Sequence, residues 1–131
     1  MPQTSHSLRT RNSICAAVST DTNSGTGTAA GRLRIENSSN VLLVEFILSN
    51  PAFGTPTGGS MTLNNAAAGT PVASGTAAWA RFIDRDGGLV VQTDVTGSGG
   101  TGGVTSLPTT TITTGVPVAL TGTPVTYSAP L

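Results

Sequence analysis

Charged side chains are scarce in this sequence, and this scarcity limits the partners it can bind. Only 9% of the 131 residues are Asp, Glu, Lys or Arg, against about 25% in an average soluble domain. Lys is absent, and six Arg balance six acidic residues to a net charge of zero. Because nucleic acids and anionic membranes are bound by strongly basic surfaces, neither is expected as a partner. A near-neutral surface is poorly protected against association, so we expect a protein partner and a homo-oligomer.

Histidine and cysteine occur once each, which leaves little material for catalysis or metal binding. A triad or metal site built on His6 would lie in the N-terminal segment, without further His to complete it. A single cysteine cannot form an internal disulfide, and Cys15 is predicted to be a small buried apolar residue. The sequence therefore predicts a protein that is not an enzyme and needs no cofactor or metal.

Long apolar runs are also missing, above all near the N-terminus. The first nineteen residues, MPQTSHSLRTRNSICAAVS, contain neither the apolar core of a secretory signal nor a stretch that could cross a membrane. We therefore expect the chain to fold in a reducing cytoplasm.

Threonine, serine and glycine are abundant in place of the missing charged residues. The sequence has 23 Thr, 13 Ser, 17 Gly and 8 Pro. Thr is branched at Cβ and suits a pleated, half-exposed surface, whereas Gly and Pro separate short strands. The length is that of one domain with one core. We expect one mainly-β domain.

The first half of the chain contains a hairpin pattern. Arg32–Glu36 alternates polar and apolar residues, as a half-buried strand does. Val41–Leu48 is almost entirely apolar, which is typical of a strand covered on both faces or central in a sandwich. Between them, Asn37–Asn40 has the composition of a turn. Pro51 should then send the chain round a corner, with Phe53 filling the core.

A second hairpin gives the strongest local signal. Ala77–Asp84 and Leu89–Val95 both have strand composition, and they flank Asp86-Gly87, whose residues tolerate the positive φ of a hairpin turn. Further strands are expected at Ser60–Leu63, Thr109–Thr114, Val116–Leu120 and Pro124–Ser128, and loops at Asn64–Gly75 and Gly97–Gly103. Seven or eight short strands predict an all-β fold, an antiparallel β-sandwich of immunoglobulin-like or jelly-roll type, over residues 31–131.

Residues 1–30 differ in composition from the rest. A weak helical pattern covers residues 5–20, and a Gly/Thr/Asn/Ser linker follows from Thr20 to Gly31. The possible caps are Ser5 and Ser7, and the possible apolar face is Leu8, Cys15 and Val18 with Ile14 beside it.

Two interpretations of this segment remain open. It could be an arm that docks on neighbouring subunits, with Leu8 and Ile14 as apolar anchors and Arg9 and Arg11 as polar contacts. Alternatively, it could fold back as a helix that covers one end of its own domain.

Trp79 and Arg81 share one face of the predicted strand by parity, with Ile83 next along. Core packing is the favoured role for Trp79. The alternative is an interface anchor, because Trp and Arg carry much of the energy of protein–protein binding.

Apparent catalytic or ligand motifs have simpler explanations. Asp84-Arg85-Asp86-Gly87 begins like a calcium loop but lacks the later Glu, and the hairpin turn explains the same residues. Gly97–Gly103 lacks the Lys-Ser/Thr ending of a phosphate loop. The spacing of Glu36, Glu45, Asp84 and Asp94 selects no catalytic pair of carboxylates.

Five segments, taken in order, resemble a group of small virion proteins of tailed bacteriophages and prophages. They are Gly31–Ile35 (GRLRI), Leu42–Leu48 (LLVEFIL), Pro51–Gly54 (PAFG), Gly75–Arg81 (GTAAWAR) and Asp86–Val95. The resemblance covers about half of the chain well, although the group typically has a longer N-terminal helix and a longer first hairpin.

This resemblance implies a structural component of the virion, made in the cytoplasm of the bacterial host. A capsid decoration (cement) protein is the favoured role, located on the surface of the phage head. Its partners would then be the major capsid protein and neighbouring copies of itself. A tail, neck, fibre or baseplate binding module is the alternative.

Overall fold

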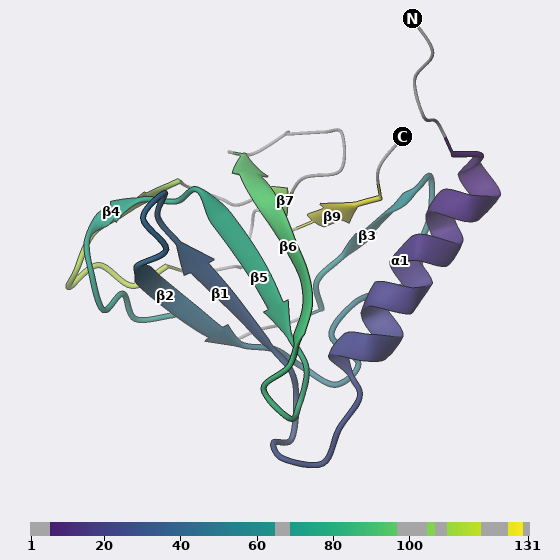
Figure 1. Ribbon diagram of the computed structural model, residues 1–131, viewed down its shortest axis with the longest axis horizontal. Helices are drawn as coiled ribbons and strands as arrows, with labels where there is room; N and C mark the ends of the chain where they lie inside the picture. The colour runs from purple at the N-terminus through teal and green to yellow at the C-terminus, as the bar shows by residue number, and fades with distance from the viewer. Residues whose placement is uncertain (1–5, 65–68, 97–104, 107–109, 119–125, 130–131) are drawn as a thin grey trace, which may run out of the picture.

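The computed structural model describes residues 6–64, 69–96, 105–106, 110–118 and 126–129. Figure 1 shows a twisted sheet with a helix at one side. The elements are α1 (Leu8–Thr22), β1 (Arg32–Glu36), β2 (Leu42–Ile47), β3 (Ser60–Thr62), β4 (Gly75–Thr76), β5 (Trp79–Ile83), β6 (Leu89–Thr96), β7 (Thr105–Ser106), β8 (Thr111–Ile112) and β9 (Thr126–Ser128). The expected Gly97–Gly103 loop lies outside the described residues, as do the last two residues of the strand expected at Val116–Leu120.

Most strands belong to a seven-stranded sheet with the order β2-β1-β5-β6-β7-β9-β3. Its strand pairs are antiparallel except β6 and β7, which run parallel. Strands β4 and β8 form a separate antiparallel pair, at the opposite end of the molecule from α1 (Figure 1). The expected mainly-β fold is confirmed. The finer expectation of an immunoglobulin-like or jelly-roll sandwich is not confirmed.

Both predicted hairpins are confirmed, and side chains fix their turns. Asn37 Oδ1 accepts the backbone N–H groups of Ser39 and Val41 at 2.9 and 3.0 Å, which closes the turn between β1 and β2. In the turn between β5 and β6, Asp84 Oδ1 accepts two backbone N–H groups in the same way. Gly87 in this turn has φ +89, a conformation that glycine adopts readily.

The core lies on the inner side of β1, β2 and β5. Its largest fully buried side chains include Phe46, Phe82, Leu33 and Ile35. Phe53 is buried after the corner at Pro51, as expected, and its ring centroid lies 5.3 Å from that of Phe82. These contacts are the main source of stability, because a fully buried large apolar side chain contributes about 1.5–3 kcal/mol.

Helix α1 packs against the sheet to which it is connected. Ser7 caps it by accepting the backbone N–H of Thr10. Cys15 and Val18 are buried, as expected, and burial raises the pKa of the Cys15 thiol. Leu8 lies two turns before Cys15 and so on the same side of the helix, but its side chain is 54% exposed.

Polar contacts fasten α1 to β3 and β9. The Arg11 guanidinium donates to the carbonyl oxygen of Ala129 at 3.3 and 3.2 Å. Asn12 Oδ1 accepts the N–H of Gly59 at 2.9 Å, and the Cys15 thiol donates to the carbonyl of the same glycine. These contacts match the second interpretation of the N-terminal segment, a helix that covers part of its own domain.

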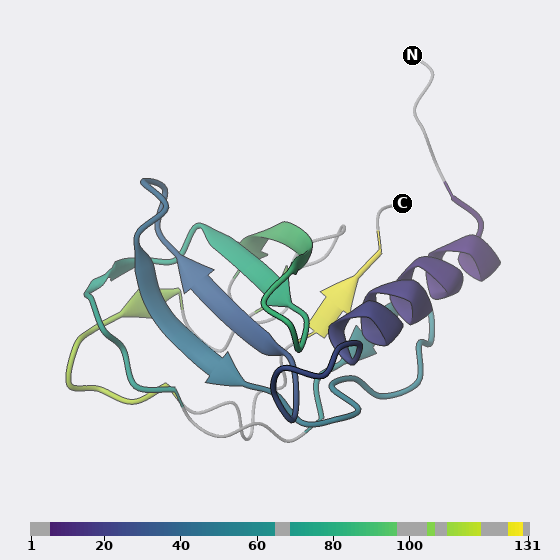
Figure 2. The same ribbon diagram turned by 60° about the horizontal axis from the view of Figure 1, so that its bottom comes forward.

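A linker was expected from Thr20 to Gly31, but Thr20–Thr22 belong to α1 and residues 23–31 are anchored along the sheet. The backbone of Thr28 donates to the carbonyl of Arg85, and Arg85 Nε donates to the carbonyl of Thr28 at 2.6 Å. A Cβ atom on Gly31 would meet two backbone oxygens at 2.6 Å. The segment lies beside the turn between β5 and β6 in Figures 1 and 2. It is therefore part of the folded domain.

Candidate interaction surface on the outer sheet face

Strands β2, β1, β5 and β6 present one face to the core and the other outward. The register places residues of the four strands in rows, and alternate rows point outward. We name this side the outer sheet face. Its three rows are Ile47–Arg32–Ile83, Glu45–Arg34–Arg81–Gln92 and Glu36–Trp79–Asp94. Leu42 and Leu89 pair with Glu36 and Ile83 at register shifts, which interrupt the alternation at these two positions.

Half of the charged residues of the chain lie in these rows, three of the six Arg and three of the six acidic residues. Glu45 divides its carboxylate between two arginines: Oε1 lies 3.1 Å from Arg32 Nη1, and Oε2 lies 3.1 Å from Arg34 Nε. Arg81 Nε lies 3.5 Å from Glu36 Oε1 and donates to Gln92 Oε1 at 2.9 Å. The face is thus a network of ion pairs.

Arg34 is the least satisfied member of this network. Its register partner is Arg81, a like charge, and like charges directly opposite one another are unfavourable. Although Arg34 Nε lies within ion-pair distance of Glu45, its N–H is buried and makes no hydrogen bond. Since partly exposed ion pairs contribute only about 0–1 kcal/mol, these charges add little to stability.

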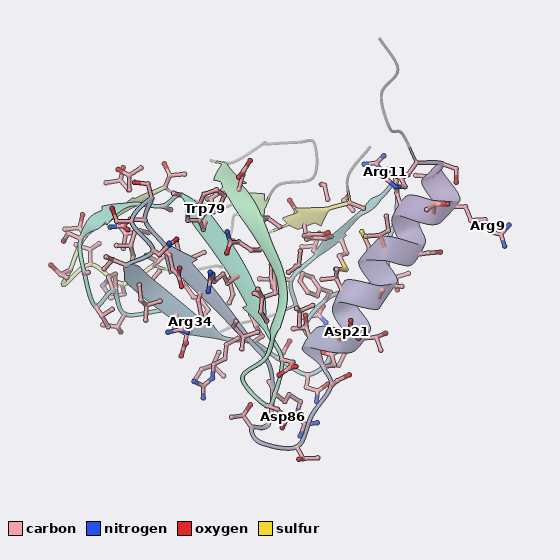
Figure 3. The ribbon with its side chains drawn as sticks, in the orientation of Figure 1. Arg9, Arg11, Asp21, Arg34, Trp79 and Asp86 are labelled. Carbon is pink, nitrogen blue, oxygen red and sulfur yellow. The ribbon has the colours of Figure 1, made fainter. Side chains whose placement is uncertain are left out.

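Trp79 lies on the outer sheet face and not in the core, so the favoured sequence interpretation of this residue is wrong. It stands between Glu36 and Asp94 in its row and is half-buried. The shared face of Trp79 and Arg81 is confirmed. Figure 3 shows Trp79 on the sheet, far from α1. An interface role for both residues stays a prediction.

Exposed apolar side chains occupy the other end of this face. Ile47 is 62% exposed and Leu89 is 55% exposed. Ile47 pairs with Arg32 at one side of the face, and Leu89 pairs with Ile83 at the other, where the register of β5 and β6 shifts. Neither exposed position was predicted. The apolar run Val41–Leu48 indicates a strand covered on both faces or central in a sandwich, whereas β2 is an edge strand in which Ile47, next to the buried Phe46, points outward.

Four N-terminal residues were predicted as contacts to a neighbouring subunit. Two of them are exposed and two contact the rest of their own chain. Leu8 and Arg9 are exposed on α1, and Figure 3 shows Arg9 pointing away from the sheet. Arg11 binds the Ala129 carbonyl, and Ile14 packs against the core of the same chain. Arg11 and Ile14 are therefore occupied within the chain, and their expected role as contacts to a neighbour is not supported.

A hollow of about 400 Å³ opens at the end of the outer sheet face nearest the turn between β5 and β6. One side, which we name the sheet wall, consists of Arg32, Arg34 and Glu45. The other side, the hairpin wall, is the turn from Asp84 to Gly87. Ile83 lies between the walls, and Gly27 and Thr28 complete the lining.

Asp86 joins the hairpin wall to the segment after α1. Its Oδ1 accepts the backbone N–H groups of Thr26 and Gly27 at 2.9 and 2.8 Å. These two hydrogen bonds lower the pKa of Asp86, and the nearby Arg85 guanidinium lowers it slightly further. The side chain therefore carries a negative charge at neutral pH.

The pKa of Asp86 leads to a testable dependence of stability on pH. A carboxyl group with a lower pKa in the folded state stabilises that state above the unfolded pKa, and the contribution is lost as the pH falls below about 4. We therefore expect a steeper fall in melting temperature between about pH 5 and pH 3 for the wild type than for Asp86→Asn, whose amide Oδ1 can still accept both N–H groups. Equal slopes for the two proteins would contradict this assignment.

Comparisons with protein-family models, with curated proteins and with solved structures each found no match for this chain. In the described ranges, His, Cys, Asp and Glu side chains form no group of three that could hold a metal ion. No helix among the described residues has both the length and the apolar character needed to cross a membrane. The outer sheet face and the five segments are therefore the features of this chain that bear on its function.

Proposed function

We propose that this chain is a non-enzymatic structural protein of a tailed bacteriophage particle, and within that class a capsid decoration protein. In this role it binds the outer surface of the major capsid shell and stabilises the head. The observation that carries the proposal is the ordered set of five segments between Gly31 and Val95. Four of them contain residues of β1, β2, β5 or β6, the strands of the outer sheet face, and the fifth, Pro51–Gly54, contains the buried Phe53.

Three of the five segments show structural tasks that explain their residues. Gly31 permits close approach of two backbone segments at the start of β1. Phe53, in the corner segment, packs against Phe82 beneath β5. The Asp86–Val95 segment forms the hairpin turn and β6. The residues that carry the resemblance therefore build the scaffold of this domain, including the strands of the outer sheet face.

The composition of the outer sheet face suits protein binding. It combines Trp79 and Arg81 with the exposed side chains of Ile47 and Leu89, and Trp and Arg are enriched among residues that dominate binding energy. A protein that binds only the assembled shell stabilises that shell by mass action. This stabilisation requires a rigid surface and no active site.

We propose in addition that the domain is a two-layered β-sandwich. Phe82 of β5 meets Tyr127 of β9 edge to face, with ring centroids 6.1 Å apart. Strands β6 and β7 separate β5 from β9 in the sheet, so this contact requires the sheet to bend around its core. The bend brings two parts of one sheet towards each other, which supports the two-layered architecture expected from the sequence.

Reconstitution on particles tests the proposal. Purified chain is added to heads assembled without it by the phage that carries its gene. We expect saturable binding to heads and an increase in the temperature at which they open. The substitution Trp79→Ser should weaken binding far more than it lowers the melting temperature of the free protein, because this side chain is half-buried and lies outside the core cluster. Asp21→Ser, at an exposed position of α1 that is not an interface candidate, serves as the surface control.

Binding to tails instead of heads would contradict the decoration role and favour the alternative, a tail, neck, fibre or baseplate module. Binding to neither would contradict the virion proposal as a whole.

A further inference from the structure

The two walls of the hollow carry opposite net charges. Two arginines and one glutamate give the sheet wall a net charge of +1. Asp84, Arg85 and Asp86 give the hairpin wall a net charge of −1. The hollow as a whole is neutral, so it has no net attraction for a polyanion such as a nucleic acid. Its charges instead suit an occupant that also has one positive and one negative side.

The sheet wall has binding capacity that the chain itself does not use. Glu45 contacts each arginine with a single oxygen, although a guanidinium offers five N–H donors and can bind a carboxylate through two of them. The Arg32 and Arg34 side chains both remain 39% exposed, so N–H groups of the two guanidinium groups other than the buried Arg34 Nε can be reached from outside. A second carboxylate next to Arg32 and Arg34 would supply acceptors for these groups.

Apolar residues flank the hollow on both sides. Ile47 stands next to Arg32 on the sheet-wall side, and Leu89 stands next to Ile83 on the hairpin side. Both are more than half exposed. The sheet wall thus has a net charge of +1 beside Ile47, and the hairpin wall has a net charge of −1 beside Leu89. The opposite charges attract, and the two apolar side chains can cover each other.

We infer that the occupant is a second copy of this chain, related by a two-fold axis. The hairpin wall of each copy lies against the sheet wall of the other, so that Asp86 of one chain approaches Arg32 and Arg34 of its partner. Leu89 of one chain then covers Ile47 of the other. Both walls border the same hollow, so the hairpin wall of each molecule can contact the sheet wall of the other at the same time. In such an isologous dimer, the two molecules use the same surface and the contacts occur twice.

Partial burial of these charges would strengthen their attraction relative to open water. The near-neutral surface of the chain offers little long-range repulsion to oppose the association. The inference does not depend on the proposed virion function, because it concerns the isolated protein.

The test measures molecular mass by analytical ultracentrifugation across a wide range of protein concentrations. We expect the wild type to form a dimer that weakens as salt is added, because its contacts are partly electrostatic. Arg34→Glu changes the net charge of the sheet wall from +1 to −1, and we expect it to raise the dissociation constant at least about tenfold, corresponding to about 1.4 kcal/mol. Arg9→Glu reverses a charge on α1, away from the hollow, and should leave the dimer unchanged.

The double variant Arg34→Glu with Glu45→Arg is the decisive control. It exchanges the two charges and restores the net charge of +1, so it should restore the dimer. Leu89→Ser should weaken the dimer while the monomer stays folded, because this side chain is exposed. If Arg34→Glu fails to fold, Asp86→Asn removes the opposing charge while keeping an acceptor for Thr26 and Gly27.

Three results would overturn the inference. A wild type that is monomeric at every concentration excludes the dimer. A dimer that tolerates both Arg34→Glu and Leu89→Ser uses another surface. A folded double variant that stays monomeric shows that the complementary charges of the two walls do not drive association.

Discussion

Deletion of residues 2–20 is expected to abolish cooperative folding of the domain. The deletion removes most of α1, including the buried residues Cys15 and Val18, and it exposes the surface of β3 and β9 beneath them. It also leaves the Ala129 carbonyl and the Gly59 N–H without their partners on α1. Each buried apolar side chain contributes about 1.5–3 kcal/mol, and a whole domain has only about 5–15 kcal/mol of stability.

Urea unfolding, followed by the fluorescence of the single Trp79, measures this effect. We expect the truncated chain to show no unfolding transition, or one at a much lower midpoint. Leu8→Ala is the control, because this residue belongs to α1 but is mostly exposed. A truncated chain that keeps the midpoint of the wild type would contradict the observed packing of α1. It would favour the other interpretation, in which residues 1–30 form an arm.

Replacement of Phe46 by Ala should be the most damaging single substitution in the sheet. Its side chain is 1% exposed and projects from β2 into the core beside Leu33, its partner in the register. Truncation of a buried Phe to Ala costs about 3–5 kcal/mol, because the lost transfer free energy is joined by the cost of a cavity. The free energy of unfolding from urea titration gives the comparison with the wild type.

Ile47→Ala, at the next residue along β2, is the matched control. Its side chain points outward and is mostly exposed, so the expected loss is within about 0.5 kcal/mol, as for other surface substitutions. Similar losses at both positions would contradict the assignment of the inner and outer faces of β2.

The parts of the fold that depend on residues close together in the sequence could be predicted. The turn from Asp84 to Gly88 and the turn that begins at Asn37 are fixed by short-range hydrogen bonds within each turn. The cap at Ser7 is also local. These signals lie within a few residues of one another, so propensity and pattern suffice to identify them.

The packing of α1 could not be predicted, because its partners are distant in the sequence. Arg11 binds Ala129 across 118 residues, and Asn12 binds Gly59 across 47. The helix is only weakly amphipathic and has few large apolar side chains, so its sequence did not indicate which face would be buried. The same limit left both interpretations of the N-terminal segment open.

The candidate site was only partly predictable. Alternation along β5 placed Trp79 and Arg81 on one face, but it did not say that this face points to solvent. The preference of tryptophan for burial suggested the opposite. The hollow was not predictable at all, because Thr28, Arg34 and Asp86 come from three separate segments. The antiparallel register of β1, β2 and β5, together with the hydrogen bonds that join Thr28 to Arg85 and Asp86 to Thr26 and Gly27, brings them together.

The number of copies of this chain in purified phage particles tests the central claim most directly. Particles released from the bacterium that carries the gene are purified, and the chain and the major capsid protein are quantified in the same sample by mass spectrometry with labelled standards. A capsid decoration protein should be present in hundreds of copies, in a fixed ratio to the major capsid protein. A dozen copies or fewer would contradict the decoration role and indicate the neck or tail, and absence of the chain from the particles would contradict the virion assignment.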